Sequence, residues 1–347
     1  MNLSELLFDR PRDLEATRPP EDRGLARDEV RLLVSTRAGD HHARFLDLAE
    51  WLRPHDLLVV NASATLPASL PARSAELGAF RVHLSTEYAP RLWLAEPRRS
   101  DALPGPLPLE PGSIVDLAGV SARVVAHYPG LPRLLFLSLA SELGPAMRSA
   151  GRPIRYAYLD REYPLDRYQT IFATSPGSAE MPSAARPFSP RVLRALRARG
   201  VGLASITLHT GVSSLDVERS PVESTALYPE PFEVPSIAAD AIERARCAGG
   251  RVIAVGTTVV RALESAVRHG RVVAARGFTR LFVHPGRPPV SFDALLTGFH
   301  DPATTHLALL YSVAGPDLVR RSYRVAVDAG YLWHEFGDSQ LWLPGEN

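Results

Sequence analysis

The sequence contains no lysine and only one cysteine. All 39 basic residues are therefore arginines, so a phosphate or carboxylate would have to be bound by guanidinium groups, main-chain amides or neutral donors. Because Cys247 has no second cysteine to pair with, an internal disulfide and a cysteine-based zinc site are both excluded. Cys247 lies near the end of a predicted amphipathic helix, where we expect it to be inert.

Long apolar runs are also absent. No stretch approaches the roughly 20 apolar residues needed to cross a bilayer, and the first residues show no apolar core flanked by positive charge. We therefore expect a cytoplasmic protein with no membrane contact, and we predict no stable protein partner. The net charge of +1 does not indicate a polyanionic partner, although a local basic face would be compatible with it.

Several common catalytic and binding motifs are missing. The sequence has no Walker P-loop, no Gly-x-Gly-x-x-Gly fingerprint, no Gly-x-Ser-x-Gly nucleophile elbow and no His-Glu-x-x-His helix. Its 11 histidines show no metal-ligand spacing. We therefore expect no bound metal.

Helical and strand-like segments alternate along most of the chain, which predicts a mixed α/β fold. The pattern changes between about Pro67 and Leu139, where alternating runs are separated by turn residues without a helical period. We expect a small antiparallel β-barrel of residues 67–139, inserted into an α/β ligand-binding domain of residues 1–66 and 140–347. One continuous mixed sheet with hairpins is the alternative. The predicted barrel strands are 80–85, 91–95, 113–117, 122–127 and 134–139.

The stretch from Gly249 to Gly270 predicts a strand, a tight turn and a helix. Arg251 to Val255 is an apolar run bounded by glycines, and Thr257 or Thr258 is placed to cap the helix that follows. Gly270 is expected to end that helix. In open α/β sheets, ligands bind at the carboxyl ends of strands, where helix N-termini present free N–H groups. The alternative is an ordinary strand-to-helix turn.

Further elements are predicted on both sides of this stretch. Ser189 and Pro190 begin a helix, and His209 follows a strand directly. Ser236 is expected to cap a helix whose buried face includes Ile237. The region 215–235 is read as irregular. The helix after Ser189 is expected over 192–199, and the strand before His209 over 203–208. The other predicted strands are 30–35, 57–61 and 278–283, and the other predicted helices are 45–52, 292–296, 303–313 and 317–327.

Polar candidates for a site gather beside these predicted strand ends. A lone histidine such as His209 is more often structural than catalytic. Arg261 and Glu264 are three residues apart, so a helix-surface ion pair is their simpler interpretation. The full set of candidates is Arg167, Tyr168, Gln169, His209, Thr257, Thr258, Arg261, Glu264, His300 and Asp338.

Five segments also carry a resemblance to a known family. The chain resembles the S-adenosylmethionine:tRNA ribosyltransferase-isomerases of the queuosine pathway, with order and spacing kept over nearly its whole length. The resemblance implies an α/β domain interrupted by a small antiparallel β-barrel, in agreement with the pattern above. The segments are Asp166 to Ser178, Ile206 to Gly211, Gly249 to Ser265, Leu295 to Thr305 and Phe336 to Leu341.

The resemblance implies a reaction as well. S-adenosylmethionine would serve as co-substrate and ribosyl donor, and 7-aminomethyl-7-deazaguanine in tRNA as acceptor, giving epoxyqueuosine, adenine and methionine. The sulfonium would acidify the neighbouring ribose carbon so that a base removes a proton. His209, His300 and Glu264 are then the catalytic candidates, and the two histidines cannot be ranked by spacing. The residues expected to hold S-adenosylmethionine are Tyr168, Gln169, Gly256, Thr257, Thr258, Arg261 and Phe299.

Some positions depart from the family pattern while the Gly-Thr-Thr turn is kept. Six residues of the family pattern are replaced here: an aspartate and an arginine, a glycine and a histidine, and two further histidines. These losses leave two alternatives to the family reaction: a related enzyme that uses S-adenosylmethionine on a non-tRNA acceptor, and a non-catalytic ligand-binding remnant. The replaced positions are, in the same order, Ala62 and Ala64, Ala185 and Pro187, and Thr225 and Tyr228.

Overall fold

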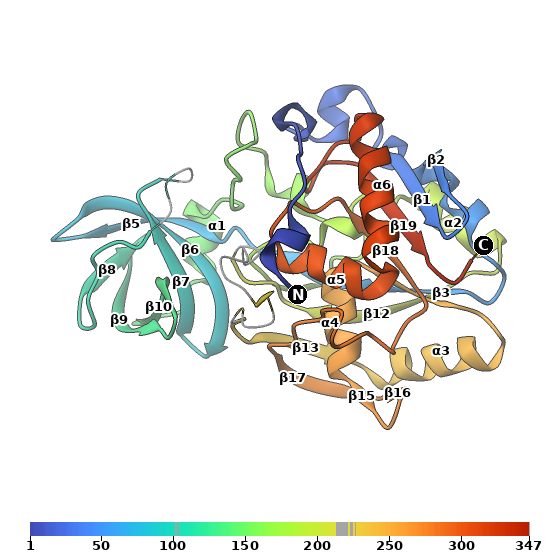
Figure 1. Ribbon diagram of the computed structural model, residues 1–347. Coiled ribbons are helices and arrows are strands. Elements are labelled where there is room, and N and C mark those ends of the chain that lie inside the picture. The colour runs from blue at the N-terminus through green and yellow to red at the C-terminus, as the bar shows by residue number, and fades with distance from the viewer. Residues whose placement is uncertain (101–102, 104, 213–220, 223–224, 226, 347) are drawn as a thin grey trace.

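The computed structural model describes residues 1–100, 103, 105–212, 221–222, 225 and 227–346. Within these ranges, a large mixed sheet is covered by helices on both faces, and a closed antiparallel barrel projects from one side of it (Figure 1). The predicted α/β fold with an inserted antiparallel barrel is confirmed, and the alternative of one continuous mixed sheet is wrong.

The nine-stranded sheet of the described residues is parallel at its centre. Strands β12, β3, β14 and β18 run parallel to one another, whereas β19 runs antiparallel to β18 and parallel to β1. The carboxyl ends of four strands therefore meet at one edge with the amino ends of β19 and β1. The order is β17 (Ala275–Thr279), β13 (Glu230–Val234), β12 (Gly202–Leu208), β3 (Leu57–Asn61), β14 (Val252–Val255), β18 (Ala294–Gly298), β19 (Ser339–Leu343), β1 (Arg31–Thr36) and β2 (Asp40–Arg44).

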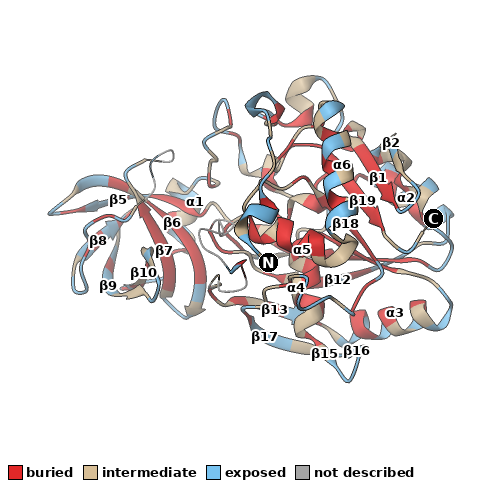
Figure 2. Cartoon of the chain, viewed as in Figure 1, coloured by how far each residue is buried: buried red, intermediate tan, exposed pale blue. Residues whose placement is uncertain are grey.

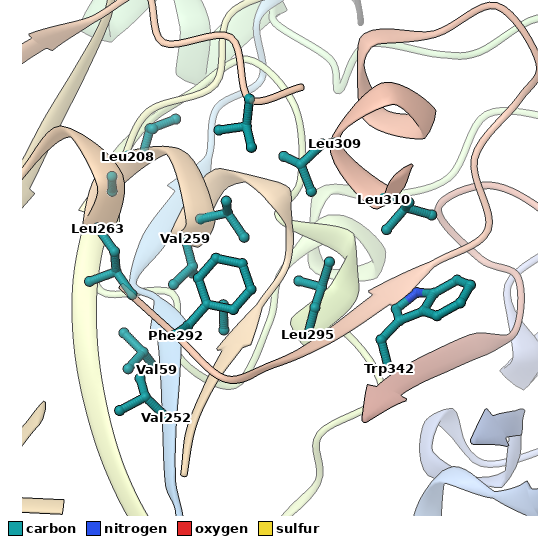
Figure 3. Close-up of a cluster of buried hydrophobic side chains, with 14 of the residues drawn as sticks. Val59, Leu208, Val252, Val259, Leu263, Phe292, Leu295, Leu309, Leu310 and Trp342 are labelled. Carbon is teal, nitrogen blue, oxygen red and sulfur yellow. The ribbon is translucent and has the colours of Figure 1, made fainter. Parts of the chain in front are cut away.

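Alternate residues of the central strands are buried on opposite faces of the sheet. Val59 and Leu295 point to the face covered by α3 to α6, and Figure 3 shows them in a cluster with Val259 and Leu309. Val60 and its alternate neighbours pack on the other face, against α2 and the 3₁₀ turn Phe45–Trp51. Strands β3 and β14 are consequently buried throughout (Figure 2).

Two of the helices around the sheet begin at a side-chain cap, and the first of these caps was predicted. The hydroxyl of Ser189 accepts a hydrogen bond from Val192 N and so caps α2, with Pro190 at its first position. Thr304 caps α5 in the same way through Leu307 N. The α-helices are α1 (Gly144–Ala150), α2 (Pro190–Ala198), α3 (Ser236–Cys247), α4 (Thr257–Ser265), α5 (Thr305–Ala314) and α6 (Pro316–Asp328). The further 3₁₀ turns are Leu3–Leu6, Arg12–Leu14, Pro20–Arg23, Arg27–Glu29, Leu165–Tyr168 and Ser183–Ala185.

The barrel closes in the order β10-β7-β6-β5-β8-β9 and has its own core. All of its neighbouring strands are antiparallel. Its interior is filled by residues such as Leu70, Leu84 and Val115, so it is a packed core and not a channel. The strands are β5 (Ser69–Ser74), which the sequence did not predict, β6 (Gly78–Ala89), β7 (Leu92–Arg98), β8 (Ile114–Leu117), β9 (Val120–Tyr128) and β10 (Leu131–Leu139).

Two predictions around the central stretch are wrong. The residue that caps α4 is Gly256, at φ 93°, and no side chain caps this helix. The helix ends at Ser265, and Gly270 lies instead in the turn between the short strands β15 (Val267–Arg268) and β16 (Arg271–Val272). A glycine suits both places because the two turns need positive φ.

Other element predictions are also corrected. Residues 292–296 do not form a helix but lead into β18, because this apolar run pairs with β14 and β19 on both sides. The predicted strand 278–283 lies earlier, as β17. Ser236 does not cap α3, and Ile237 is 73% exposed.

The region 215–235 contains a strand where irregular structure was expected, since Glu230–Val234 forms β13 beside β12 and β17. The part of this prediction that falls on 215–220, 223–224 and 226 lies outside the described residues. One further short pair of strands, β4 (Ser63–Thr65) with β11 (Ser175–Ser178), follows β3 directly. In the described part of the chain, no helix has the length and hydropathy of a membrane span.

Candidate functional site

A cavity of about 400 Å³ lies at the edge where the parallel strands end, and we call it the main cavity. The strand ends position its wall, because Thr210 follows β12, Gly256 follows β14 and Phe299 follows β18. The segment before β19 forms the opposite side. The lining residues are Glu15, Tyr156, Tyr158, Glu180, Met181, Pro182, Ser183, Ala184, Thr210, Val255, Gly256, Thr257, Thr258, Thr297, Gly298, Phe299, His300, Asp301, Thr304, His306, His334 and Glu335.

The Gly256 turn brings three predicted residues to this wall. A Cβ on Gly256 would lie 3.3 Å from the Cβ of Ala184, and its φ of 93° favours glycine. Thr257 and Thr258 start α4 and line the cavity with it. The side-chain Nδ2 of Asn61 donates to Thr258 Oγ1 at 3.2 Å, so the end of β3 holds the start of α4 in place.

Two histidines occupy the same wall next to each other. The Nε2 atom of His300 lies 2.9 Å from Thr297 Oγ1, and its ring centre lies 4.8 Å from that of His306. Burial and the neighbouring histidines hold the pKa of His300 well below its usual range. Burial and the charge of Arg261 lower the pKa of His306 to about 4. Both rings are therefore neutral at pH 7.

An aromatic stack forms another part of the lining. The ring of Tyr158 lies between those of Tyr156 and His334, at 5.5 Å and 4.2 Å between ring centres and nearly parallel to both. Burial and the charge of Glu180, to which Tyr156 is hydrogen-bonded, raise the pKa of Tyr156 well above its usual range. Such a stack is a rigid apolar surface with polar groups at its rim.

Carboxylates are the most frequent charged groups among the described lining residues. Glu15 lies 3.1 Å from Arg10, and Asp301 lies 2.8 Å from the same guanidinium. Glu180 bonds to the aromatic stack, as described above. Glu335 has no such partner, and burial raises its pKa to about 7. The cavity therefore favours a positively charged molecule.

Besides Asp301 Oδ1, which forms an ion pair with Arg10, four polar atoms of this lining are buried without a hydrogen-bond partner among the described residues. They are the hydroxyl oxygens of Tyr158 and Thr210, His334 Nε2 and Glu335 Oε2. Buried polar groups are almost always hydrogen-bonded, and leaving one unpaired costs about 1–3 kcal/mol. Four such atoms around one cavity indicate a polar ligand that would complete their hydrogen bonds.

His209 lies behind this wall and not in its lining. Its Nδ1 atom lies 2.7 Å from Ser63 Oγ, and Ser63 Oγ lies 2.6 Å from Ser178 Oγ. A Cβ on Gly177 would lie 2.6 Å from the His209 ring, so the ring packs flat on the main chain there. Burial lowers the pKa of His209. Its position supports Thr210, the next residue, in the cavity wall.

A smaller cavity of about 60 Å³ shares Glu180, Thr210 and His306 with the main one. Its walls include the ion pair between Arg261 of α4 and Glu230 of β13, in which Glu230 is buried and Arg261 is 14% exposed. Glu230 also accepts a hydrogen bond from Gly211 N at 2.8 Å. Arg261 is therefore paired with the sheet and not with Glu264.

Three further predicted site residues have contacts outside the cavity lining. Glu264 accepts hydrogen bonds at 2.7 Å from the main-chain nitrogens of the loop Val290–Ser291. Gln169 exchanges two hydrogen bonds with the main chain of Thr65, whose hydroxyl donates to Tyr168 O. These contacts join the 3₁₀ turn at Tyr168 to β4. The structure gives all three residues a structural role.

Phe299 lies in the lining and Asp338 does not. The ring of Phe299 packs against Trp333 and Tyr331, with ring centres 4.8 Å and 5.4 Å apart. Asp338 binds the guanidinium and main-chain nitrogen of Arg31, which fixes the start of β19 beside β1. Asp338 therefore orders the segment that carries the cavity residues His334 and Glu335.

Sequence reasoning missed most of the cavity lining, and five of the missed residues carry the aromatic stack and its neighbouring carboxylates. They are Tyr156, Tyr158, Glu180, His334 and Glu335. The first two belong to a tyrosine-rich segment, which was a usable signal, but their partners come from a part of the chain about 175 residues further on. Their convergence depends on the tertiary fold.

Two of the positions that depart from the family pattern have defined hydrogen bonds. The main-chain oxygen of Ala62 accepts hydrogen bonds from Thr174 N and Ser175 N at 3.0 Å, so this position works through its backbone. Tyr228 is buried, and its hydroxyl donates to Val212 O at 2.7 Å. No group of three or more His, Cys, Asp or Glu side chains in the described ranges could hold a metal ion.

Comparisons with known proteins point to one family. Residues 3–342 match the model of a family described as queuosine biosynthesis protein. The S-adenosylmethionine:tRNA ribosyltransferase-isomerase of Thermus thermophilus is 40% identical over 328 residues, which are 91% of this chain and 93% of the relative. The protein of the same name from Anaeromyxobacter dehalogenans is 36% identical over 99% of both chains. A crystal structure of S-adenosylmethionine tRNA ribosyltransferase from Thermotoga maritima has a TM-score of 0.55 at 27% identity and covers 98% of this chain and 100% of that one.

Proposed function

Because this chain belongs to the family of queuosine biosynthesis proteins, we propose that it is an S-adenosylmethionine:tRNA ribosyltransferase-isomerase whose main cavity binds S-adenosylmethionine. The main support for this reaction is that relatives of that name are 36% to 40% identical to this chain over 91% to 99% of its length. It favours the family reaction over a different acceptor and over a protein that only binds a ligand.

The properties of the main cavity support the choice of ligand. S-adenosylmethionine carries a sulfonium cation, an adenine ring and an amino acid group. The unpaired Glu335 suits the cation, and the stack of Tyr156, Tyr158 and His334 offers an aromatic surface beside it. The unpartnered hydroxyls of Tyr158 and Thr210 could bond to the polar groups of the same molecule.

The chain's own residues then have definable roles. The sulfonium acidifies the neighbouring ribose carbon, and the protein supplies position and a proton acceptor. The Gly256 turn lets a ligand approach the main chain closely, and Thr257 and Thr258 add hydroxyls there. His300 and His306 stay neutral, so they do not repel the cation. Positioning of this kind lowers the barrier because less entropy is lost at the reacting step.

The test combines binding with product analysis. The purified protein is titrated with S-adenosylmethionine by calorimetry, and adenine and methionine are then quantified with tRNA that carries 7-aminomethyl-7-deazaguanine and with the same tRNA lacking it. We expect binding, and adenine release only with the modified tRNA. Adenine release that does not depend on the modified base would contradict the proposed acceptor, and the absence of binding would contradict the proposed ligand.

A further inference from the structure

Glu335 differs from the other three carboxylates of the main cavity. Glu15 and Asp301 share the guanidinium of Arg10, and Glu180 is bonded to Tyr156. Glu335 has a buried oxygen with no hydrogen-bond partner in the described part of the chain. Asp301 Oδ1 also lacks a hydrogen bond but forms an ion pair with Arg10. Among the described residues this leaves Glu335 Oε2 as the buried carboxylate oxygen of the cavity that is available to a bound molecule.

The cavity histidines are less suited to accept a proton. His300 already uses Nε2 toward Thr297, and burial and its neighbours keep it neutral. His306 has a pKa of about 4 beside Arg261, which makes it a weak base at neutral pH. His334 is stacked on Tyr158, and burial lowers its pKa too.

The main chain on both sides of Glu335 is closely packed. It lies two residues before Gly337, where a Cβ would collide with the main chain of Trp333, so the segment packs closely on itself. Gly337 N donates to His334 O at 3.0 Å, and His334 has a φ of 73°, which is uncommon for a residue other than glycine. A base fixed in this way loses little entropy when it acts.

We propose that Glu335 is the base that removes the acidified proton of S-adenosylmethionine in the main cavity, an inference that rests on the proposed function. A free carboxylate is drawn to the sulfonium, and the acidified hydrogens lie on the carbon bonded to that sulfur. The group that pairs with the cation is therefore the group next to these hydrogens.

The proton balance of this step closes within the reaction. The C–H bond breaks, its electron pair stays on the ribose carbon, and an O–H bond forms on the Glu335 carboxylate. Adenine needs a proton on its departing ring nitrogen to leave as a neutral base. The amine of the acceptor forms a bond to the ribose carbon as the bond to adenine breaks, and the departing ring nitrogen keeps that electron pair and takes the proton from Glu335. The amine releases its own surplus proton to solvent.

The first test measures S-adenosylmethionine affinity by calorimetry at pH 6 and pH 8, without tRNA. Only the ionised carboxylate pairs with the cation. From pH 6 to pH 8 the affinity of the wild type for S-adenosylmethionine should therefore rise by a factor about ten times larger than the affinity of Glu335→Gln does. The exposed Glu142 offers a matched control, and Glu142→Gln should behave as wild type. An equal pH dependence in wild type and Glu335→Gln would overturn the proposal.

The second test measures adenine release with modified tRNA from pH 5.5 to 8.5. We expect Glu335→Gln to lower kcat at least about 100-fold with little change in KM, and to lose the fall in rate below neutral pH. Glu335→Asp keeps the carboxylate but places it farther from the cavity, so its rate should be lower and should still fall below neutral pH. This variant also covers the case in which Glu335→Gln does not fold.

The outcomes separate the two proposals. If the wild type turns over and Glu335→Gln keeps a near-normal kcat and an unchanged pH profile, the role of Glu335 is refuted and the proposed function stands. A wild-type protein that neither binds S-adenosylmethionine nor releases adenine would refute the proposed function, and the role of Glu335 with it.

Discussion

Removal of the negative charge of Glu230 should destabilise the protein far more than the same change at an exposed ion pair. Glu230 is 4% exposed and pairs with Arg261, whose side chain is only 14% exposed, across the junction of β13 and α4. Glu230→Gln would leave that guanidinium buried without a counter-charge, which costs about 3–5 kcal/mol. The glutamine can still accept from Gly211 N, so we expect the lower end, about 3 kcal/mol.

The chain offers a matched control for this prediction. Glu243 pairs with Arg271 at 2.6 Å, but the two side chains are 43% and 65% exposed. Glu243→Gln should therefore cost less than about 1 kcal/mol. Both variants are compared with wild type by urea unfolding followed by circular dichroism.

A double variant tests the reason for the effect. Arg261→Met in the Glu230→Gln background removes the unpaired charge and keeps an apolar side chain of similar length. It should recover at least half of the lost stability. Equal unfolding free energies for Glu230→Gln and Glu243→Gln would refute the argument from burial, and no recovery in the double variant would refute the unpaired charge as the cause.

Three further predictions concern the residues around the site. Gly177→Ala places a Cβ 2.6 Å from the His209 ring and should lower the free energy of unfolding in urea by about 1–3 kcal/mol. Gly39→Ala is the control, because a Cβ there meets nothing within 4 Å, and it should change stability by less than about 1 kcal/mol. Similar values for the two variants would contradict the packing argument. Glu335 has a pKa of about 7 when folded against 4.5 as a free side chain, so its contribution to stability is full below about pH 4.5 and is lost as the pH rises through 7. Between pH 4.5 and 8, wild type should lose about 2–3 kcal/mol relative to Glu335→Gln, and a constant difference would exclude the raised pKa. Ser189→Ala removes the cap of α2 and should lower unfolding free energy by about 1 kcal/mol, measured by thermal unfolding; an unchanged melting temperature would exclude a stabilising cap.

The sequence was informative where local pattern and tertiary environment agree. The strand 57–61 was predicted within its observed bounds because a β-branched apolar run at the centre of a parallel sheet is buried on both faces. The start of α2 followed from Ser189 and Pro190, which act locally. The change of pattern after Pro67 separated the barrel from the α/β sheet, although β5, with Pro71 in its middle, escaped notice.

The failures have physical reasons. Residues 292–296 are apolar enough for either a helix or a strand, and pairing on both sides by β14 and β19 decides for the strand. The predicted apolar face of α3 is buried at Ile242 and Ala245, but Ile237 in the first turn is exposed and its neighbour Ala238 is buried instead. Such choices depend on neighbours that a local pattern does not contain.

The site was predicted in part. The edge of the sheet, the Gly256 turn, His300 and Phe299 followed from strand ends and from the resemblance, and the structure brings them to one cavity. Glu264 and Gln169 instead bond to main-chain groups elsewhere, because polar residues of a motif also serve the fold. Glu335 gave no sequence signal, since its importance comes from its lack of a partner.

The place of β19 has a consequence for the order of folding. This strand fills the gap between β18 and β1, and Arg31 contacts Asp338 across 307 residues of sequence. The closing of so long a loop is slow, and pairings of high sequence separation form late. During synthesis, β1 must therefore wait for its parallel neighbour until nearly the whole chain has been made. The barrel can fold long before, because its strands are close in sequence. A partly synthesised chain would therefore contain a folded barrel beside an incomplete sheet, and the main cavity would lack the side formed by the segment before β19.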